Sequence, residues 1–228
     1  MPRIIALASP RTSSKTTNAA WLSSALHQRG YPVKAFDADL SHQLTDWHAA
    51  NGWDFPCLGA ASRMANKNIP AALSDKDVAV VDVGHLEEHL EIARAVLRVA
   101  DVLLVNLVPA PADIERLEKL PLGGWPEEVA ARMQAEQELA EPPTGFMEDV
   151  NSLRAEPLPV RILLSRCQPG TLAPRETREL MISYGYEVMR TQIPGVQRYA
   201  LTGEGFALDP RGSAHDELVT ELIEKGLL

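Results

Sequence analysis

Cysteine is scarce in this sequence, with only two among 228 residues. Cys57 and Cys167 lie far apart and neither belongs to a CxxC pair, so we expect no disulfide framework and no cysteine zinc site. No apolar stretch is long enough to span a bilayer, and the apolar run at the N-terminus is too short for a signal peptide. We therefore expect a soluble protein of the reducing cytoplasm, with no membrane partner.

Positive charge is also in short supply. Lys and Arg total 22 against 31 Asp and Glu, which gives a formal net charge of -9. This balance argues against a protein coated with basic residues for nucleic acid, although it leaves room for a local positive face. The hydrophobic content of 45% is sufficient to build one sizeable core. We expect a single domain that covers residues 1–228.

Short apolar runs rich in β-branched residues predict the strands of a parallel sheet that is covered on both faces. These runs are residues 4–8, 33–36, 78–81, 102–108, 160–165 and 186–193. Helical patterns alternate with them at residues 16–29, 86–99, 111–120 and 174–184, and Gly30 and Gly185 close the first and the last. The alternation predicts an α/β fold with a doubly wound, mostly parallel sheet flanked by helices.

Two segments depart from this alternation. Residues 121–157 read as a turn, a polar helix and a proline-rich loop, which we interpret as an inserted, solvated surface excursion, with a partner-binding arm as the alternative. Residues 212–228 have an amphipathic helical pattern that begins near Ser213, a good N-cap residue. Because this pattern lacks the basic face of a membrane-surface anchor, we expect the helix to dock on the domain.

The stretch SPRTSSKTT, residues 9–17, follows the first predicted strand and leads into a predicted helix. In a phosphate-binding loop, the amides at a helix N-terminus attract phosphate, a Lys reaches the outer phosphates and a Thr hydroxyl holds magnesium. Lys15 and Thr16 occupy those two places. The pattern GxxxxGK[ST] requires glycine where Ser9 and Ser14 stand, so a Ser/Thr-rich N-cap with a chance Lys is the alternative.

Carboxylates follow two of the predicted strands. Asp37 and Asp39 are two residues apart at the end of the second strand, so strand alternation points them to the same side. Asp82 ends the apolar run AVVDVGH, a place from which a carboxylate can reach magnesium through water. Such groups could orient the waters of a phosphoryl transfer; a polar strand terminus and a helix cap are the ordinary alternatives.

As a succession of elements, the chain resembles the ParA family of deviant Walker-type partition ATPases, in the ParA/MinD superfamily, and particularly its small plasmid-encoded members. The family loop K-G-G-x-G-K-[ST]-T corresponds to residues 10–17 here. The stretch NAAWLSSALHQRGYPVKAFDADL is similar to the family's NLAxALAxxGxxVLxxDxD, and DKDVAVVDVGH looks like its Walker B strand. The stretches VRILLSRCQPGT and TQIPGVQRYALTGEGFAL resemble late strands that frame the adenine, and the likeness covers nearly the whole chain outside residues 121–157.

This resemblance implies a P-loop NTPase-like fold that binds ATP and Mg²⁺. It places a nucleotide at Pro10, Arg11, Thr12, Ser13, Ser14, Lys15, Thr16, Thr17, Arg166, Pro194 and Val196. It assigns catalysis to Lys15, Asp37, Asp39 and Arg11, and magnesium to Thr16, Asp39 and Asp82. Pro10 stands where the family's signature lysine contacts the nucleotide of the dimer partner. Arg11 is the nearest cation that could replace this lysine, unless it is simply a solvated loop residue.

The resemblance also implies a role in plasmid or chromosome partition (DNA segregation). The protein would form a homodimer around MgATP, bind DNA without sequence preference, associate with the nucleoid, and hydrolyse ATP slowly under stimulation by a ParB-like centromere-binding adaptor. DNA contacts are assigned to Arg175, Arg178 and Arg198, although an arginine scatter often serves only solubility. The loop lacks glycine and the signature lysine. The alternative is therefore a degenerate pseudo-ATPase of the same fold that acts as a dimeric interaction module.

Overall fold

The computed structural model describes residues 1–228 except 11–13, 85, 87–88, 119–145 and 206. A seven-stranded, all-parallel sheet lies at its centre, in the order β3-β2-β4-β1-β5-β6-β7. The strands are β1 (Arg3–Ala8), β2 (Val33–Ala38), β3 (Cys57–Gly59), β4 (Val78–Val83), β5 (Val102–Leu107), β6 (Val160–Leu164) and β7 (Glu187–Val188). The predicted doubly wound, mostly parallel sheet in a single domain is therefore confirmed.

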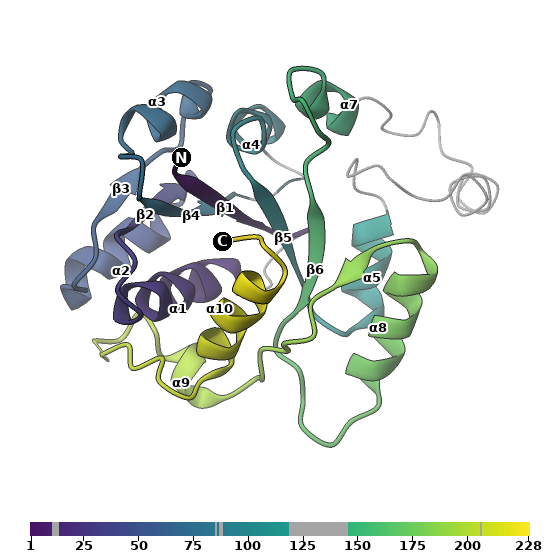
Figure 1. Cartoon of the computed structure of the whole chain (residues 1–228). Helices are drawn as coiled ribbons and strands as arrows, with labels where there is room; N and C mark the ends of the chain where they lie inside the picture. The colour runs from purple at the N-terminus through teal and green to yellow at the C-terminus, as the bar shows by residue number, and fades with distance from the viewer. Residues whose placement is uncertain (11–13, 85, 87–88, 119–145, 206) are drawn as a thin grey trace.

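Helices cover both faces of this sheet (Figure 1). One layer contains α1 (Lys15–Gln28), α2 (Gln43–Asn51), α9 (Gln197–Ala200) and α10 (Ala214–Glu224). The other layer contains α3 (Ala65–Ala71), α4 (Leu90–Leu97), α5 (Pro111–Glu118), α7 (Phe146–Asn151) and α8 (Ala173–Ser183).

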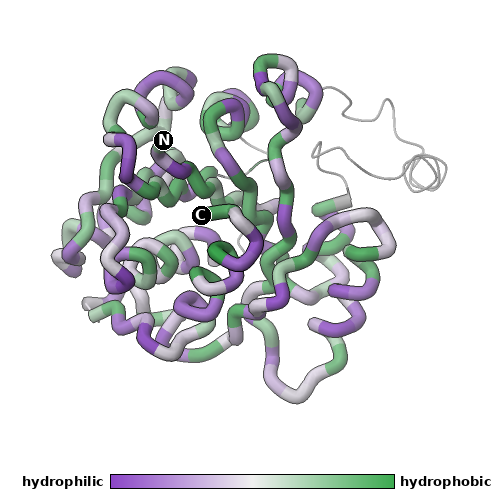
Figure 2. Tube along the Cα trace, viewed as in Figure 1, coloured by the Kyte–Doolittle hydropathy of each residue, from purple (hydrophilic) through white to green (hydrophobic). Residues whose placement is uncertain are grey.

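Strand alternation explains why two apolar layers form. In β1, Ile4 and Ala6 pack into the cluster beneath α3 and α4, whereas Ile5 and Leu7 pack into the cluster beneath α1 and α10. Figure 2 shows apolar residues concentrated along the central strands, with polar and apolar positions mixed along the surrounding helices. Burial of this two-sided apolar surface is the main contribution to folding and holds the strand ends in fixed positions.

Several elements differ from the sequence expectation. The last strand, β7, is much shorter than the predicted residues 186–193, because regular pairing with β6 stops after Val188; the Ile193 N–H donates again to Leu164 O at 2.9 Å. Helix α4 is described over Leu90–Leu97 within the predicted 86–99. Helix α2 was not predicted, and it buries only Leu44, so its sequence carries no apolar periodicity.

The C-terminal part of the predicted excursion packs on the core. Residues 121–145 lie outside the described residues, but α7 buries Phe146, Met147 and Val150. The Arg94 guanidinium lies 5.4 Å from the centroid of the Phe146 ring, and its Nε lies 3.2 Å from Asp149 Oδ2. This part of the segment therefore covers α4, in contrast to the solvated excursion that we expected.

Helix α10 docks on the domain as expected. Ser213 is its N-cap, and its Oγ accepts hydrogen bonds from the backbone N–H of His215 (3.2 Å) and Asp216 (3.3 Å). Leu218 and Leu222 are fully buried against the layer that contains α1. Among the described helices, none has the length and apolar character needed to cross a membrane.

Candidate functional site

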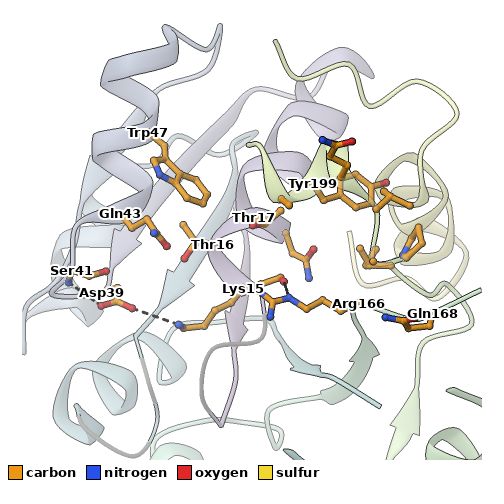
Figure 3. Close-up of a pocket in the computed structure, with 18 residues that line it drawn as sticks. Lys15, Thr16, Thr17, Asp39, Ser41, Gln43, Trp47, Arg166, Gln168 and Tyr199 are labelled. Carbon is orange, nitrogen blue, oxygen red and sulfur yellow. Dashed lines mark hydrogen bonds and ion pairs between the residues drawn. The ribbon is translucent and has the colours of Figure 1, made fainter. Parts of the chain in front are cut away.

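The candidate site lies at the carboxyl ends of the central strands. Strand β1 is flanked by β4 and β5, and the chain leaves it first toward β2 on one side and later toward β5 on the other. Ligands of open α/β sheets bind in the crevice that such a reversal of strand order creates. A pocket of about 710 Å³ opens here, within the range of small-molecule sites (Figure 3).

Two groups of residues line this pocket. The first comes from the start of α1 and the segment that follows β2: Ser14, Lys15, Thr16, Thr17, Asn18, Asp39, Ser41, Gln43 and Trp47. The second follows β6 and β7: Arg166, Gln168, Ile193, Pro194, Gly195, Val196, Gln197, Tyr199 and Ala200. Of the predicted nucleotide residues, Ser14, Lys15, Thr16, Thr17, Arg166, Pro194 and Val196 are present in this lining. Pro10 is not among them, and Arg11, Thr12 and Ser13 lie outside the described residues.

Ser14 keeps the backbone conformation for which a phosphate loop ordinarily uses glycine. Its φ and ψ are 67° and 22°, in the left-handed region, and it is the residue before the first helical position of α1. A side chain there costs about 1–2 kcal/mol relative to a right-handed conformation. Its hydroxyl makes no capping hydrogen bond to α1, which argues against the alternative of an ordinary serine N-cap.

Lys15 begins α1 and lies beneath the pocket. Its Nζ lies 3.6 Å from Asp39 Oδ2, and the two side chains are only 6% and 10% exposed. Figure 3 shows the Lys15 side chain extending from the helix start toward Asp39. At 3.6 Å the pair is longer than a direct hydrogen bond, so it is held mainly by Coulomb attraction.

Asp82, at the end of β4, is the most unusual group of the site. Its side chain is fully buried, and neither carboxylate oxygen accepts a hydrogen bond from a described residue. Burial raises the pKa of Asp82 to about 7, against the opposing effects of the Lys15 charge and the nearby Thr16 hydroxyl. The negative charges of Asp37 and Asp39 raise it further. A buried carboxylate without donors is costly unless a cation completes its surroundings.

Asp37 and Asp39 do not share one environment. Asp37 Oδ1 accepts from the backbone N–H of Asp39 (3.1 Å), and its Oδ2 accepts from the backbone N–H of Thr45 (2.9 Å). Only Asp39 lines the pocket. Asp37 therefore shapes the loop that carries Asp39 and fixes the start of α2, rather than facing the pocket beside it.

The opposite wall is built by two backbone segments that pair with each other. The Cys167 N–H donates to Ile193 O (3.0 Å), and the Gly195 N–H donates to Cys167 O (2.9 Å). A Cβ on Gly195 would lie 3.3 Å from Arg166 O, a tight contact that would require the two segments to shift by a few tenths of an ångström. This pairing places Arg166 and Pro194 at the same wall, which the sequence predicted only through the family resemblance.

Trp47 is a pocket residue that the sequence analysis did not single out. It comes from α2 and lies over Thr16 and Thr17 in Figure 3. A Cβ on Gly203 would lie 2.6 Å from Cε2 of its indole. Nothing in a single sequence pairs these two positions, because the contact exists only after the chain has folded.

Replacement of Gly203 with alanine is expected to displace the Trp47 ring and to destabilise the protein. The added methyl overlaps the indole, and overpacking of this kind costs about 1–3 kcal/mol. Chemical unfolding monitored by tryptophan fluorescence measures both effects. The matched control is Gly59→Ala, because a Cβ at Gly59 meets nothing within 4 Å. Equal stability of the two variants would show that Trp47 is not held against Gly203.

A buried polar network connects the pocket to α10. Asn18 Nδ2 donates to Asn106 Oδ1 (2.6 Å) and to Ser165 Oγ (2.9 Å). Asn18 Oδ1 lies 3.0 Å from His215 Nε2, and because an amide oxygen only accepts, this nitrogen carries the proton. Burial, together with the positive charge of Arg198, lowers the pKa of His215 to about 3. His215 is thus a neutral donor that joins α10 to the first turns of α1.

We expect the free energy of unfolding to fall as the pH drops below 6.5, in part because of His215. The unfolded chain binds a proton near the ordinary histidine pKa of 6.5, whereas the folded chain does not until about 3, so acid favours unfolding. His215→Phe, which keeps a ring beside Trp21 and Tyr199, should flatten the decline between pH 6.5 and 5. Urea titrations across this range measure the slope; an unchanged slope would contradict the buried neutral state.

The predicted DNA contacts are mostly engaged within the protein. Arg178 donates to the backbone oxygens of Met189 (2.7 Å) and Val188 (3.3 Å), where β7 ends. The Arg198 guanidinium lies 4.9 Å from the centroid of the Tyr199 ring and donates to its hydroxyl. Arg175 is exposed, with only a 3.8 Å ion pair to Glu179 on the same helix. Of the three, Arg175 alone has a guanidinium that a described backbone or ring does not hold.

Comparison with known proteins identifies the fold. No protein-family model and no curated protein sequence matches the chain. A solved structure of a putative plasmid partition protein from Borrelia burgdorferi B31, bound to AMPPNP, has a TM-score of 0.65 at 13% identity and covers 99% of this chain and 100% of its own. A ParA family ATPase from Chlorobium tepidum TLS has a TM-score of 0.59 at 16% identity and covers 97% of both chains.

A third similar structure carries a different name. Cobyrinic acid a,c-diamide synthase from Mycobacterium smegmatis, with bound ADP and magnesium, has a TM-score of 0.63 at 17% identity and covers 99% of this chain and 97% of its own. At such identities the likeness establishes the fold and not the activity. The predicted P-loop NTPase-like fold is confirmed, and it is shared with these proteins and with the MinC:MinD cell division protein complex from Aquifex aeolicus, at a TM-score of 0.60 and 16% identity over 98% of this chain and 96% of that chain.

Proposed function

We propose that this protein is a ParA/MinD-type partition ATPase that binds MgATP in the pocket at the N-terminus of α1. The observation that carries the proposal is Asp82, a fully buried carboxylate beside Lys15 and Thr16 whose oxygens make no hydrogen bond of ordinary geometry with a described residue, although the Thr16 hydroxyl is near enough to lower its pKa. A hydrated cation next to Asp82 would supply the missing donors, and the first-turn amides of α1 suit an anion. A metal-bound polyphosphate would supply both the cation next to Asp82 and the anion at the first-turn amides of α1.

Each residue has a distinct proposed task. Lys15 would leave Asp39 and bind the outer phosphates, and the Thr16 hydroxyl and Asp82 would hold Mg²⁺, Asp82 through the water shell of the ion. When bound, Mg²⁺ would neutralise the charge that develops on the transferred phosphoryl group. Asp39, which lines the pocket and is released from Lys15, would position the attacking water and the metal's water shell. Pro194 and Val196 would form an apolar wall for the base.

Titration calorimetry with MgATP and with a nonhydrolysable analogue tests the proposal. We expect saturable binding at micromolar nucleotide. The two ligands should bind with similar affinity, because binding occurs before the hydrolysis step in which they differ. The complete absence of heat at millimolar nucleotide would contradict a nucleotide site of any kind.

The second candidate is a pseudo-ATPase that keeps the fold and acts as a dimeric interaction module. Pro10 favours it, because this position holds no cation for a partner's nucleotide, and the strained Ser14 replaces a glycine. Arg11, the proposed substitute, lies outside the described residues. Magnesium-dependent ATP turnover that disappears in Lys15→Ala would exclude this candidate, whereas nucleotide binding without turnover would favour it.

The finer parts of the proposal concern partners. We infer a homodimer formed on MgATP, nonspecific DNA binding, slow hydrolysis stimulated by a ParB-like adaptor, and a cytoplasmic protein that joins the nucleoid when ATP-bound; the support is the shared fold alone. Among the predicted DNA contacts, Arg175 is the one to test, because Arg178 and Arg198 are engaged. Fluorescence anisotropy with a labelled random duplex should show salt-dependent binding only with MgATP. A DNA affinity that is independent of both the salt concentration and MgATP would contradict this inference.

A further inference from the structure

Arg166 combines a strained backbone with a contact across the pocket. Its φ is 53°, in the left-handed region, and it lies two residues beyond the buried end of β6, after the buried Ser165. Its Nε–H donates to Ser14 Oγ at 2.6 Å. Three described non-glycine residues have positive φ, and this hydrogen bond joins two of them. Strain of this kind persists where the surrounding structure requires a particular geometry, and it is concentrated at functional sites.

The charge balance of the pocket leaves a place for a second cation. Among the described lining residues, Lys15 and Arg166 are the cationic ones. Lys15 is already offset by Asp39 at 3.6 Å, and the buried Asp82 lies close enough for Lys15 to lower its pKa. A nucleoside triphosphate adds several negative charges to this neighbourhood. Lys15 and the proposed Mg²⁺ together do not balance these charges and the two carboxylates.

The Ser14 hydroxyl directs Arg166 to the place where phosphate would lie. Ser14 precedes the first turn of α1, so its Oγ stands beside the uncapped helix amides. Figure 3 shows the Arg166 side chain reaching from the opposite wall to this point. A guanidinium has five N–H donors, and the bond to Ser14 uses only that of Nε, which leaves the two terminal amino groups for an anion. Their planar fork matches two phosphate oxygens.

We propose that Arg166, oriented by Ser14, is the second phosphate-binding cation of this pocket and acts within one protomer on nucleoside di- and triphosphates. This inference rests on the proposed nucleotide site. It also gives the serine at position 14 a purpose, since a glycine would provide the same backbone conformation without the oxygen that orients Arg166. Arg166 would contact the ligand directly, and Ser14 would be a positioning residue.

Competition binding against a fluorescent ADP analogue tests the proposal with MgATP, MgADP and AMP as competitors. Arg166→Ala should weaken MgATP and MgADP by roughly 10- to 100-fold, as expected for loss of a charge-assisted contact, and AMP far less. Arg166→Lys should recover part of the loss. Ser14→Ala should weaken the diphosphate and triphosphate to a smaller degree, and should add nothing in the Arg166→Ala background, because Ser14 acts through Arg166.

The matched control is Arg3→Ala, which removes an exposed arginine at the start of β1, outside the pocket lining, and should leave all three affinities unchanged. Thermal melting without nucleotide verifies that each variant is folded. Equal loss for AMP and MgATP in Arg166→Ala would assign Arg166 to the base, the ribose or the α-phosphate, which the two nucleotides share, and would overturn a role specific to di- and triphosphates. Tighter binding in Arg166→Ala would overturn it as well, because the arginine would then be a latch that blocks the pocket.

The binding measurements distinguish failure of the proposed nucleotide site from failure of the proposed role of Arg166. If wild-type protein binds MgATP and Lys15→Ala does not, while Arg166→Ala binds as wild type, the nucleotide site stands and the role of Arg166 is refuted. If wild-type protein binds none of the three nucleotides, the proposed function and the role of Arg166 are both refuted.

Discussion

Lys15→Ala is expected to weaken MgATP binding by at least about 100-fold, beyond a single lost charge-assisted contact. Lys15 is buried at the start of α1, 3.6 Å from Asp39, and its charge opposes the raised pKa of Asp82. Without it, Asp39 in the pocket lining and the buried Asp82 behind it repel the incoming phosphates with no ammonium group to offset them. The variant therefore removes an attraction and exposes a repulsion. Titration calorimetry with MgATP and with MgADP measures the loss.

A matched control for this variant is Lys34→Ala. Lys34 is also a lysine paired with a carboxylate, with its Nζ 2.8 Å from Asp77 Oδ2, and it donates to Ala72 O away from the pocket. We expect this control to lose stability while nucleotide affinity stays at the wild-type value. MgATP binding by Lys15→Ala at wild-type affinity would show that the α1 N-terminus is not a phosphate site.

The sheet could be predicted because its strands are nearly continuous apolar runs, which have no stable place except between two helical layers. The short elements after β2 could not. Helix α2 buries only Leu44 and depends on the Asp37 carboxylate, which accepts from the Thr45 N–H near its start. Strand β7 ends after Val188, where Arg178 binds the freed carbonyl oxygens. Contacts of this kind come from tertiary structure and leave no periodic pattern in the sequence.

The site was predictable in its parts and less so in its geometry. Lys15 and Thr16 come after β1, and Asp82 lies near the carboxyl end of β4, the neighbouring parallel strand. Because the carboxyl ends of parallel strands lie at one edge of the sheet, the proximity of these residues follows from the strand order. Ser14 replaces a glycine of the phosphate-loop pattern, so the sequence alone suggests that the loop has lost its shape. The backbone at Ser14 nevertheless keeps the left-handed conformation that a glycine would adopt. The Ser14 hydroxyl accepts a hydrogen bond from Arg166 across the pocket. Because these two residues are remote in sequence, the contact could not be predicted from the sequence.

Asp82→Asn is expected to make the metal-free, nucleotide-free protein more stable at pH 8. The folded-state pKa of Asp82 is about 7, against an ordinary aspartate pKa of 3.8, so the folded chain binds the proton more tightly than the unfolded chain. In the wild type, protonation of Asp82 therefore stabilises the folded state fully below pH 3.8, and this contribution to stability is lost as the pH rises to about 7. Asparagine removes the charge, and the gain above pH 7 should be roughly 2–4 kcal/mol, at about 1.4 kcal/mol per pH unit. The melting temperature in EDTA should rise by about 5–10 °C.

Asp77→Asn is the control of opposite sign. The pKa of Asp77 is lowered, mainly by the hydrogen bond from Lys34, so its charged form contributes stability above its unfolded pKa and the substitution should lower the melting temperature at pH 8. Added Mg²⁺ separates function from stability: it should tighten ATP binding to wild type and to Asp77→Asn, but much less to Asp82→Asn. An Asp82→Asn protein that melts below wild type at pH 8 in EDTA would mean that the Asp82 carboxylate is satisfied inside the fold, and the main argument for a cation beside it would be lost.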